Sequence, residues 1–181
     1  MPCPIARSLE HVGEWWSILI LRDALLGLTR FDQFQKSLGI APNMLARRLN
    51  ALVAGGLLER RRYSERPPRD EYVPTARALD FRPILIALLA WGNKHFTPEG
   101  PSVLLVNTRT GATVDPVLVD SATGRSITGP EYALAPGPAA GERTQRRLAS
   151  AREAWRSGTP RAARPRRKPS VGRRGGTNAT K

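Results

Sequence analysis

The sequence predicts a mainly helical protein with one small β-hairpin, an additional short β segment and a disordered basic C-terminal tail. Apolar residues recur at helical spacing through most of residues 1–100. One stretch near residue 60 instead predicts two short strands around a proline-rich turn. Residues 129–181 contain only three Leu, Val, Ile or Phe side chains, too few for a core. We therefore expect a domain over 1–100, a small β-rich extension over 101–128 and a mostly disordered tail over 129–181.

Four short helices are expected before residue 55, because each apolar series is followed by glycine. The glycines that end them are Gly13, Gly27, Gly39 and the pair Gly55-Gly56. The apolar positions of the four helices are, in order, Ile5, Leu9 and Val12; Trp16, Leu19, Ile20 and Leu26; Phe31, Phe34 and Leu38; and Leu45, Leu49, Leu52 and Val53. The fourth helix, about 42–54, is expected to begin at Pro42, since proline suits the first turn of a helix.

Residues Leu57–Tyr63 predict a strand, and Glu71–Val73 predict its return partner after a turn at Pro67–Arg69. Thr75 is then expected to cap a long final helix. Pro83 lies inside this helix, so a kink or a restart is expected there.

Two further short strands are expected in the extension, at Val103–Val106 and Thr113–Val119. They lie on either side of Arg109-Thr110-Gly111, which resembles a turn. No internal repeat is expected in the chain.

Positive charge is concentrated at the C-terminus. The chain has 29 Lys and Arg against 15 Asp and Glu, a net charge of +14. Residues 143–181 hold 13 of the basic residues and one acid, Glu153. This balance predicts an anionic partner such as nucleic acid.

Residues 141–155 are expected to form either a short, marginal helix or an exposed polar segment, because they contain few apolar residues that could pack a helix against a partner.

The residue inventory excludes several classes of protein. Cys3 is the only cysteine and there are two histidines, which excludes a disulfide framework and a Cys- or His-rich metal site. No apolar stretch is long enough to span a bilayer and no signal peptide is visible, so a cytoplasmic protein without a membrane partner is expected. There is no Gly-rich phosphate loop, no pair of catalytic carboxylates and no His-Glu zinc motif. We therefore expect neither enzyme activity, nor a cofactor, nor a bound metal.

The order of elements predicts a helix-turn-helix followed by a wing. A sharp corner at Gly39–Pro42 precedes a short helix whose apolar row turns inward, which leaves polar residues on its outer or flanking positions. These are Asn43, Met44, Arg47, Arg48 and Asn50. Arg can donate two hydrogen bonds to guanine, and Asn can pair with adenine. The hairpin supplies cations for phosphates or the minor groove at Arg60, Arg61, Arg62, Arg66 and Arg69. Exposed arginines are also common on solvated helix faces, so DNA binding is inferred from the whole combination.

Several motifs occur in the order of one known family. The runs CPIARSLEHVGEWWSILILRDALLG and RFDQFQKSLGIAPNMLARRLNALVAGGLLERRRYSERPPRDEY are followed by Arg82-Pro83-Ile84-Leu85 and by Trp91-Gly92. Together they resemble the HxlR-type winged helix-turn-helix transcriptional regulators, a MarR-like family, over about residues 3–96. A weaker likeness to longer bacterial members extends through about residue 128.

The resemblance implies a bacterial, dimeric, sequence-specific DNA-binding regulator of the cytoplasm, associated with the nucleoid. Dimers of this family form through the first and last helices and place two recognition helices, here about 42–54, in successive major grooves. The wing, about 60–72, lies on the DNA backbone or in the minor groove. By position the DNA-facing residues are Pro42, Asn43, Met44, Arg47, Arg48, Arg66 and Arg69, to which the basic hairpin adds Arg62.

The chain departs from the family pattern at Ala41 and Ala46, where Ser or Thr is usual. The change at Ala41 removes a helix cap and a phosphate contact. Cys3 matches a position where some members carry a redox-reactive cysteine near the dimer interface. It is a candidate redox sensor, because a thiolate forms more readily near a helix N-terminus; the alternative is an inert packing thiol. An unidentified small-molecule effector is the other form of control left open.

The competing interpretation is a nucleic-acid-binding or architectural protein without sequence specificity, driven by the tail. Arginines between residues 161 and 174 alternate with Pro and Gly. This is typical of a flexible arm that adds salt-sensitive affinity, and a minor-groove hook is the more specific alternative. The role of 101–128 is open between a dimer contact, a ligand cap and a spacer.

Overall fold

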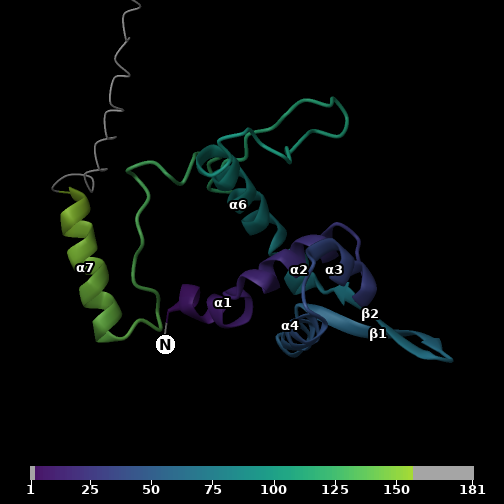
Figure 1. Cartoon of the computed structure of the whole chain (residues 1–181). Helices are drawn as coiled ribbons and strands as arrows, with labels where there is room; N and C mark the ends of the chain where they lie inside the picture. Colours follow the sequence, from purple (N-terminus) through teal and green to yellow (C-terminus); the bar gives the residue numbers. More distant parts are fainter. Residues whose placement is uncertain (1–2, 157–181) are drawn as a thin grey trace, which may run out of the picture. The chain divides into compact units, whose positions relative to one another are not determined.

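The structure, a computed structural model, describes residues 3–156. The chain divides after Thr128 into two compact units, which are described separately. Within the described residues, the first unit is mainly helical with a two-stranded hairpin, as predicted, and the second contains one helix (Figure 1).

Four helices occupy the N-terminal part of the chain, as predicted. Their bounds are α1 Pro4–Val12, α2 Trp15–Leu25, α3 Phe31–Leu38 and α4 Pro42–Ala54. Gly39 closes α3 in the left-handed region at φ +61°, and its N–H donates to the Gln35 carbonyl oxygen at 2.9 Å. Glycine adopts this conformation without steric cost, so the chain can turn sharply into α4.

The core lies between α2, α3, α4 and the base of the hairpin. The large side chains that are fully buried there are Ile20, Leu21, Phe34, Leu45, Leu49, Leu52 and Leu58. Burial of each side chain of this kind stabilises the fold by about 1.5–3 kcal/mol. The three leucines of α4 are spaced four and three residues apart, so one face of this helix packs in the core and the opposite face is left to solvent.

The hairpin consists of β1 Leu58–Glu65 and β2 Pro68–Pro74, paired antiparallel. Both strands are longer than predicted, and the turn is Arg66-Pro67, not Pro67–Arg69. A proline is accepted at Pro68 because a two-stranded hairpin has only edge strands, where a missing N–H need not break the ladder.

Two contacts attach the hairpin to the start of α3. The Tyr72 N–H donates to the Thr29 carbonyl oxygen at 2.7 Å. Arg30 and Glu71 form an isolated antiparallel bridge beside it. The base of the wing is therefore held by the segment that leads into the helix-turn-helix.

The predicted final helix is interrupted. It forms α5 Ala76–Leu79 and α6 Arg82–His95, and Pro83 lies in the first turn of α6. The predicted restart at this proline is therefore confirmed, since a proline is compatible with a first turn but not with a helix interior.

The predicted cap by Thr75 is wrong. Thr75 precedes α5, but its side chain makes no capping hydrogen bond. Its hydroxyl lies 2.7 Å from the carbonyl oxygen of Gly56 and 3.2 Å from that of Leu57. The hydroxyl donates to this pair of carbonyls because the loop between α4 and β1 lies against it, which could not be inferred from local sequence.

The two strands predicted in the extension are not formed. Residues 101–128 contain only isolated bridges, between Val106 and Thr113 and between Val119 and Ser126. Each bridge closes a six-residue turn, so the chain reverses before a strand can extend.

The two turns, 107–112 and 120–125, form an internal repeat, contrary to the expectation from the sequence. In each, the first side chain accepts a hydrogen bond from the N–H two residues on, at 2.9 Å for Asn107 and 3.0 Å for Asp120. In each, the fifth residue is a glycine with positive φ, +71° at Gly111 and +68° at Gly124. The shared pattern is Asn/Asp-x-x-Thr-Gly, which the sequence alone could have revealed.

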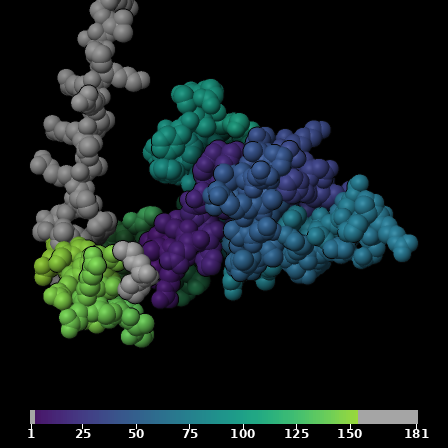
Figure 2. All heavy atoms as spheres, turned by 60° about the horizontal axis from the view of Figure 1, so that its bottom comes forward, coloured from purple at the N-terminus to yellow at the C-terminus, as the bar shows by residue number. Residues whose placement is uncertain are grey.

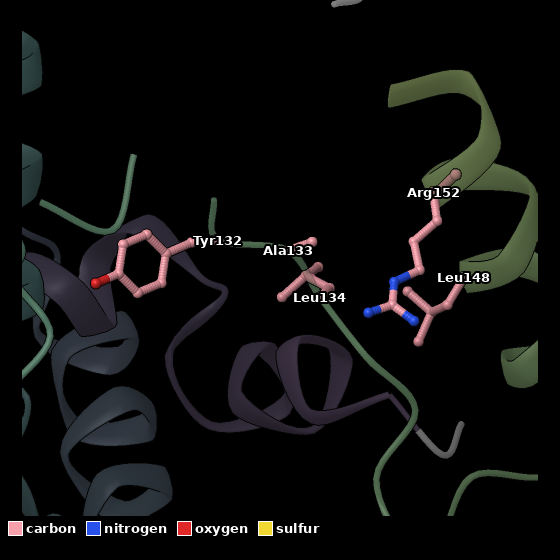
Figure 3. A pocket seen from close by; sticks show the side chains of 6 residues that line it. Tyr132, Ala133, Leu134, Leu148 and Arg152 are labelled. Carbon is pink, nitrogen blue, oxygen red and sulfur yellow. The ribbon is translucent and has the colours of Figure 1, made fainter. Parts of the chain in front are cut away.

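The second unit contains α7 Glu142–Arg156, so of the two alternatives for residues 141–155 the helix is confirmed. Leu148 and Arg152 of α7 face Leu134 across a hollow of about 260 Å³ (Figure 3). The rest of the predicted tail, 157–181, lies outside the described residues.

Gly39→Ala is expected to lower the free energy of unfolding by about 1 kcal/mol, because an L-residue is strained at this positive φ. No heavy atom lies within 4 Å of the added Cβ, so a clash would not contribute. Gly39→Asn should lose less, because Asn tolerates the left-handed region. Urea unfolding followed by circular dichroism measures the three stabilities, and equal values would contradict the left-handed cap.

Candidate nucleic-acid interface

The outer face of α4 is defined by the burial of its opposite side. Asn43, Arg47 and Asn50 follow one another at four and three residues and are exposed, while Leu45 and Leu49 are buried. Pro42 is also exposed and Met44 is half-buried at the rim of this face. Figure 2 shows α4 and the hairpin together on one face of the first unit, with the hairpin projecting beyond the helix.

Arg47 is the cation that α4 presents most freely. Its side chain is exposed, and its Nη2 donates to the Met44 sulfur at 3.4 Å. Among residues 3–156 no carboxylate pairs with it. A guanidinium in this state can donate two parallel hydrogen bonds to guanine.

Arg48 occupies a flanking position of α4 and, unlike Arg47, is mostly buried. Its side chain is only 16% exposed, and its Nη2 lies 2.8 Å from Oε2 of Glu14. Its Nε is buried and makes no hydrogen bond within the described chain. Position 48 lies on the flank of α4 between the buried and the outer row, where the start of α2 covers it. Arg48 is thus paired within the protein, and its contact with DNA stays a prediction.

Asn50 is tied to the hairpin. Its Oδ1 accepts a hydrogen bond from Nη2 of Arg60, whose guanidinium also lies 5.6 Å from the centre of the Tyr72 ring. This contact joins the outer face of α4 to β1. Arg60 is thus engaged at the base of the wing and is not a free cation.

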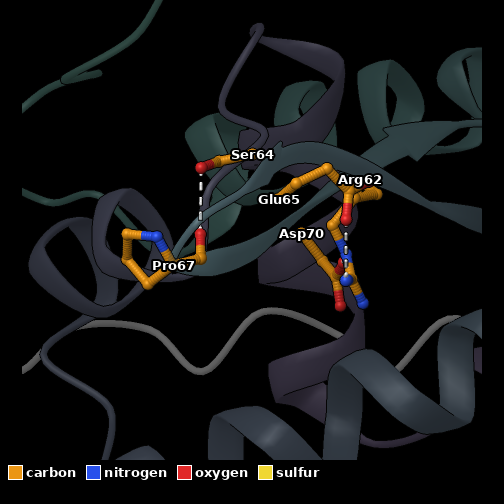
Figure 4. Close-up of polar contacts among 5 residues, drawn as sticks. All are labelled: Arg62, Ser64, Glu65, Pro67 and Asp70. Atoms are coloured by element: carbon orange, nitrogen blue, oxygen red, sulfur yellow. Dashed lines mark hydrogen bonds and ion pairs between the residues drawn. The ribbon is translucent and has the colours of Figure 1, made fainter.

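Arg62 is paired with two neighbouring carboxylates. Its Nε lies 2.8 Å from Oδ1 of Asp70, and its Nη1 lies 3.6 Å from Oε2 of Glu65 (Figure 4). The hydrogen bond and charge of Asp70, with a smaller effect of Glu65, raise the pKa of Arg62 above its ordinary value. Glu59 acts in the same way on Arg61, at 3.1 Å. Both arginines carry their charge but offer little net positive potential to a phosphate.

The free cations of the wing are Arg66 and Arg69. Both are exposed, and no carboxylate in the described part of the chain pairs with them. Arg66 lies in the turn and Arg69 in β2 just after it. The Ser64 hydroxyl fastens this turn by donating to the Pro67 carbonyl oxygen at 2.9 Å (Figure 4). A tip of this kind suits contact with phosphates or the minor groove.

Arg30 belongs to the same surface and was not singled out by the sequence. It is exposed at the N-cap of α3, and its guanidinium lies 4.7 Å from the centre of the Tyr63 ring in β1. With Arg69 and Asp70 it lines a shallow hollow beside the wing. An arginine before a helix carries no signal of its own, because only the pairing of Arg30 with Glu71 brings it to the hairpin.

Cys3 lies at the N-cap position of α1 and is half-buried. Its carbonyl oxygen accepts a hydrogen bond from the Arg7 N–H at 3.0 Å. Redox sensing by Cys3 stays a prediction.

Over residues 3–156, no helix combines the length and apolar character needed to cross a bilayer. Within the same residues, no group of three or more His, Cys, Asp or Glu side chains is arranged to hold a metal ion.

Asp70→Asn is expected to tighten binding to a duplex of arbitrary sequence. Loss of this carboxylate would free Arg62 to meet a phosphate, and the slope of log affinity against log salt should steepen by up to about 0.9. Fluorescence anisotropy at several salt concentrations measures both quantities. Asp80→Asn is the matched control, because it removes an exposed carboxylate at the C-cap of α5. An equal effect of both substitutions would show that Arg62 does not reach the DNA.

Comparison with known proteins identifies the family. A family model described as HxlR-like helix-turn-helix matches residues 11–100. An uncharacterized HTH-type transcriptional regulator of Mycobacterium bovis is 39% identical over 135 residues, 74% of this chain and 85% of that protein. A Synechocystis protein of the same description is 38% identical over 98 residues, 54% of this chain and 73% of that protein.

Two solved structures extend the likeness beyond residue 100. PA1374 of Pseudomonas aeruginosa, described as a candidate transcription factor, is 56% identical, covers 81% of this chain and all of its own, and has a TM-score of 0.59. PA1607, another candidate transcription factor, is 37% identical over 75% of this chain and 96% of its own, with a TM-score of 0.68. Each share is larger than residues 1–100 alone.

The curated relatives are regulators, in agreement with the expectation that the chain is not an enzyme. The resemblance noted in the sequence, the helical fold with its two-stranded wing and the matched family model agree. This chain is a helix-turn-helix transcriptional regulator of the HxlR-like family.

Proposed function

We propose that the protein regulates transcription by binding a two-fold symmetric DNA site as a homodimer, with α4 in the major groove and the wing on the backbone or in the minor groove. The observation that carries this proposal is the outer row of α4. Its inner row is fixed in the core, and Asn43 and Arg47 remain exposed at the N-terminal half of the helix. This half is the part that reads base edges in helix-turn-helix proteins.

The wing supports the same mode of binding. Arg66 and Arg69 are exposed and free of carboxylate partners among the described residues, and Arg30 lines the same hollow as Arg69. Contacts from such cations to phosphates would hold the recognition helix in register without reading sequence. Pro42 and Met44 border the same face and complete the proposed contact surface.

Exposed apolar surface on α1 and α6 supports the homodimer. In α6, Ile84, Leu88 and Trp91 follow one another at helical spacing, and more than two fifths of each is exposed. In α1, Ile5 and Leu9 are exposed in the same way. No residue of α6 is buried, although the helix is apolar on most sides. Such helices normally pack against another element, and a second copy of this chain would supply it.

Charge supports a separate contribution from the C-terminal part. α7 carries five arginines against two acids, and the residues beyond it are strongly basic in sequence. The arginines are Arg143, Arg146, Arg147, Arg152 and Arg156. These cations would add affinity that depends on salt and not on sequence. A protein in which this part were the main DNA reader would be the non-specific binder considered as the alternative.

Selection of bound duplexes from a random DNA pool tests the proposal and the alternative together. Full-length protein and a 1–128 variant, which ends at the boundary between the two units, are compared at low and near-physiological salt. A shared palindromic motif is the expected result. Binding without any motif, lost on truncation, would assign nucleic-acid binding to the C-terminal part alone.

Arg47→Ala is expected to weaken binding to the selected site by about 5- to 150-fold, the range for loss of one bidentate base contact. Binding to unselected duplex should change much less. Arg109→Ala, which removes an exposed arginine from the extension, is the control with the same charge change. Site affinity unchanged in a folded Arg47→Ala protein would contradict the proposed recognition helix.

Leu88→Asp is expected to convert the dimer to a monomer, because a carboxylate would be buried in the apolar interface. Sedimentation equilibrium measures the change. Leu134→Asp, at another exposed leucine in the second unit, should leave the mass unchanged. A Leu88→Asp protein that remains dimeric would place the interface elsewhere.

Control through oxidation of Cys3 or through a small molecule stays a prediction. A DNA-binding regulator of this kind would act on the bacterial nucleoid.

A further inference from the structure

One ion pair holds the recognition helix from outside the helix-turn-helix. Arg48, in the middle of α4, lies 2.8 Å from Glu14 at the N-cap of α2. The arginine side chain is 16% exposed and the glutamate 58%. An ion pair with one buried partner is less screened than a surface pair, so its loss has a larger effect. Removal of Glu14 would leave the guanidinium largely buried and unpaired.

Glu14 lies at the corner between α1 and α2, which are separated only by Gly13 and Glu14. A second close approach between α4 and this part of the chain occurs at the C-terminal end of α4. A Cβ placed on Gly55 would lie 3.1 Å from Nδ1 of His11 in α1. Two points of α4, its middle and its C-terminal end, are thus held against α1 and the corner that follows it.

We propose that the Glu14–Arg48 ion pair is a positioning element that fixes the recognition helix relative to α1, and through α1 sets the distance between the two recognition helices of the dimer. The inference rests on the proposed function, because α1 carries the exposed Ile5 and Leu9 of the proposed dimer face. Half-sites of such dimers lie about 34–36 Å apart, one turn of DNA. A small shift of α4 occurs in both protomers, so it changes this distance twice.

Substitution of Glu14 distinguishes two roles of the ion pair, because they predict different changes in DNA affinity. If only the local charge matters, Glu14→Gln removes an anion from the neighbourhood of α4 and should tighten DNA binding or leave it unchanged. If the ion pair positions α4, the same substitution weakens binding to the selected site. The number of phosphates contacted stays the same, so the salt dependence should not change.

The test uses full-length protein, the selected palindromic duplex and two variants of it with the half-sites moved closer or farther by one base pair. Glu14→Gln is expected to weaken binding to the selected duplex by about fivefold, a coupling typical of residues in direct contact. Its preference for the selected spacing over the two altered ones should fall, while the salt slope stays that of the unmodified protein. Glu99→Gln, at an exposed glutamate beyond α6, should change none of these quantities.

Arg48→Met and the double variant complete a mutant cycle. Arg48→Met should reproduce the loss of spacing preference, and Glu14→Gln should add nothing in its background. Arg48→Lys, which keeps the charge, should recover part of the preference. If Arg48→Met does not fold, as judged by thermal unfolding, the half-exposed Glu14 still provides the decisive variant.

Two results would overturn the inference. One is a Glu14→Gln protein with the affinity and spacing preference of the Glu99→Gln control. The other is an Arg48→Met protein whose salt slope falls by about 0.9, which would make Arg48 a phosphate contact. Failure of the unmodified protein to select any two-fold site is a different outcome, which would reject the proposed function and this inference with it.

Discussion

The packing of Leu45, Leu49 and Leu52 into the core is the constraint on which the DNA-binding surface depends. These buried side chains fix the rotation of α4 about its own axis, and this rotation decides which residues of the helix reach solvent. The left-handed Gly39 adds the second condition, because it lets α4 begin directly after α3. Affinity for a particular DNA sequence would thus derive from apolar packing on the far side of the helix.

Carboxylates decide which arginines of this surface remain available. Arg48 is paired with Glu14, and Arg62 is paired with Asp70 and Glu65. These cations are paired within the protein. Arg47 and the arginines at the wing tip have no carboxylate partner among residues 3–156, so they are the cations available for the proposed contact with DNA. Pairing of this kind leaves few free cations on the proposed DNA-binding surface, while the sequence beyond α7 supplies most of the net positive charge.

The described protomer has exposed apolar surface on α1 and α6. The extension over 101–128 lies beside α6, where the Asn93 side chain donates to the Val103 carbonyl oxygen at 2.9 Å. It leaves the stripe of Ile84, Leu88 and Trp91 open. Of these two helices, α1 leads directly into the corner whose Glu14 pairs with Arg48 of α4. Dimer geometry and DNA geometry would therefore be coupled through α1.

The local sequence determined the helices, the corner and the existence of the wing. Apolar spacing and glycine positions depend on neighbours along the chain, so the bounds of α1 to α4 could be predicted closely. The repeat of Asn107 and Asp120 was equally visible in the sequence, although the short strands expected there did not form. Tertiary structure decided which polar groups are occupied. Thr75 binds carbonyls next to β1, Arg30 reaches the wing and Arg48 meets Glu14. These partners are distant in sequence, and a charged or polar side chain carries no local signal of the group that will pair with it.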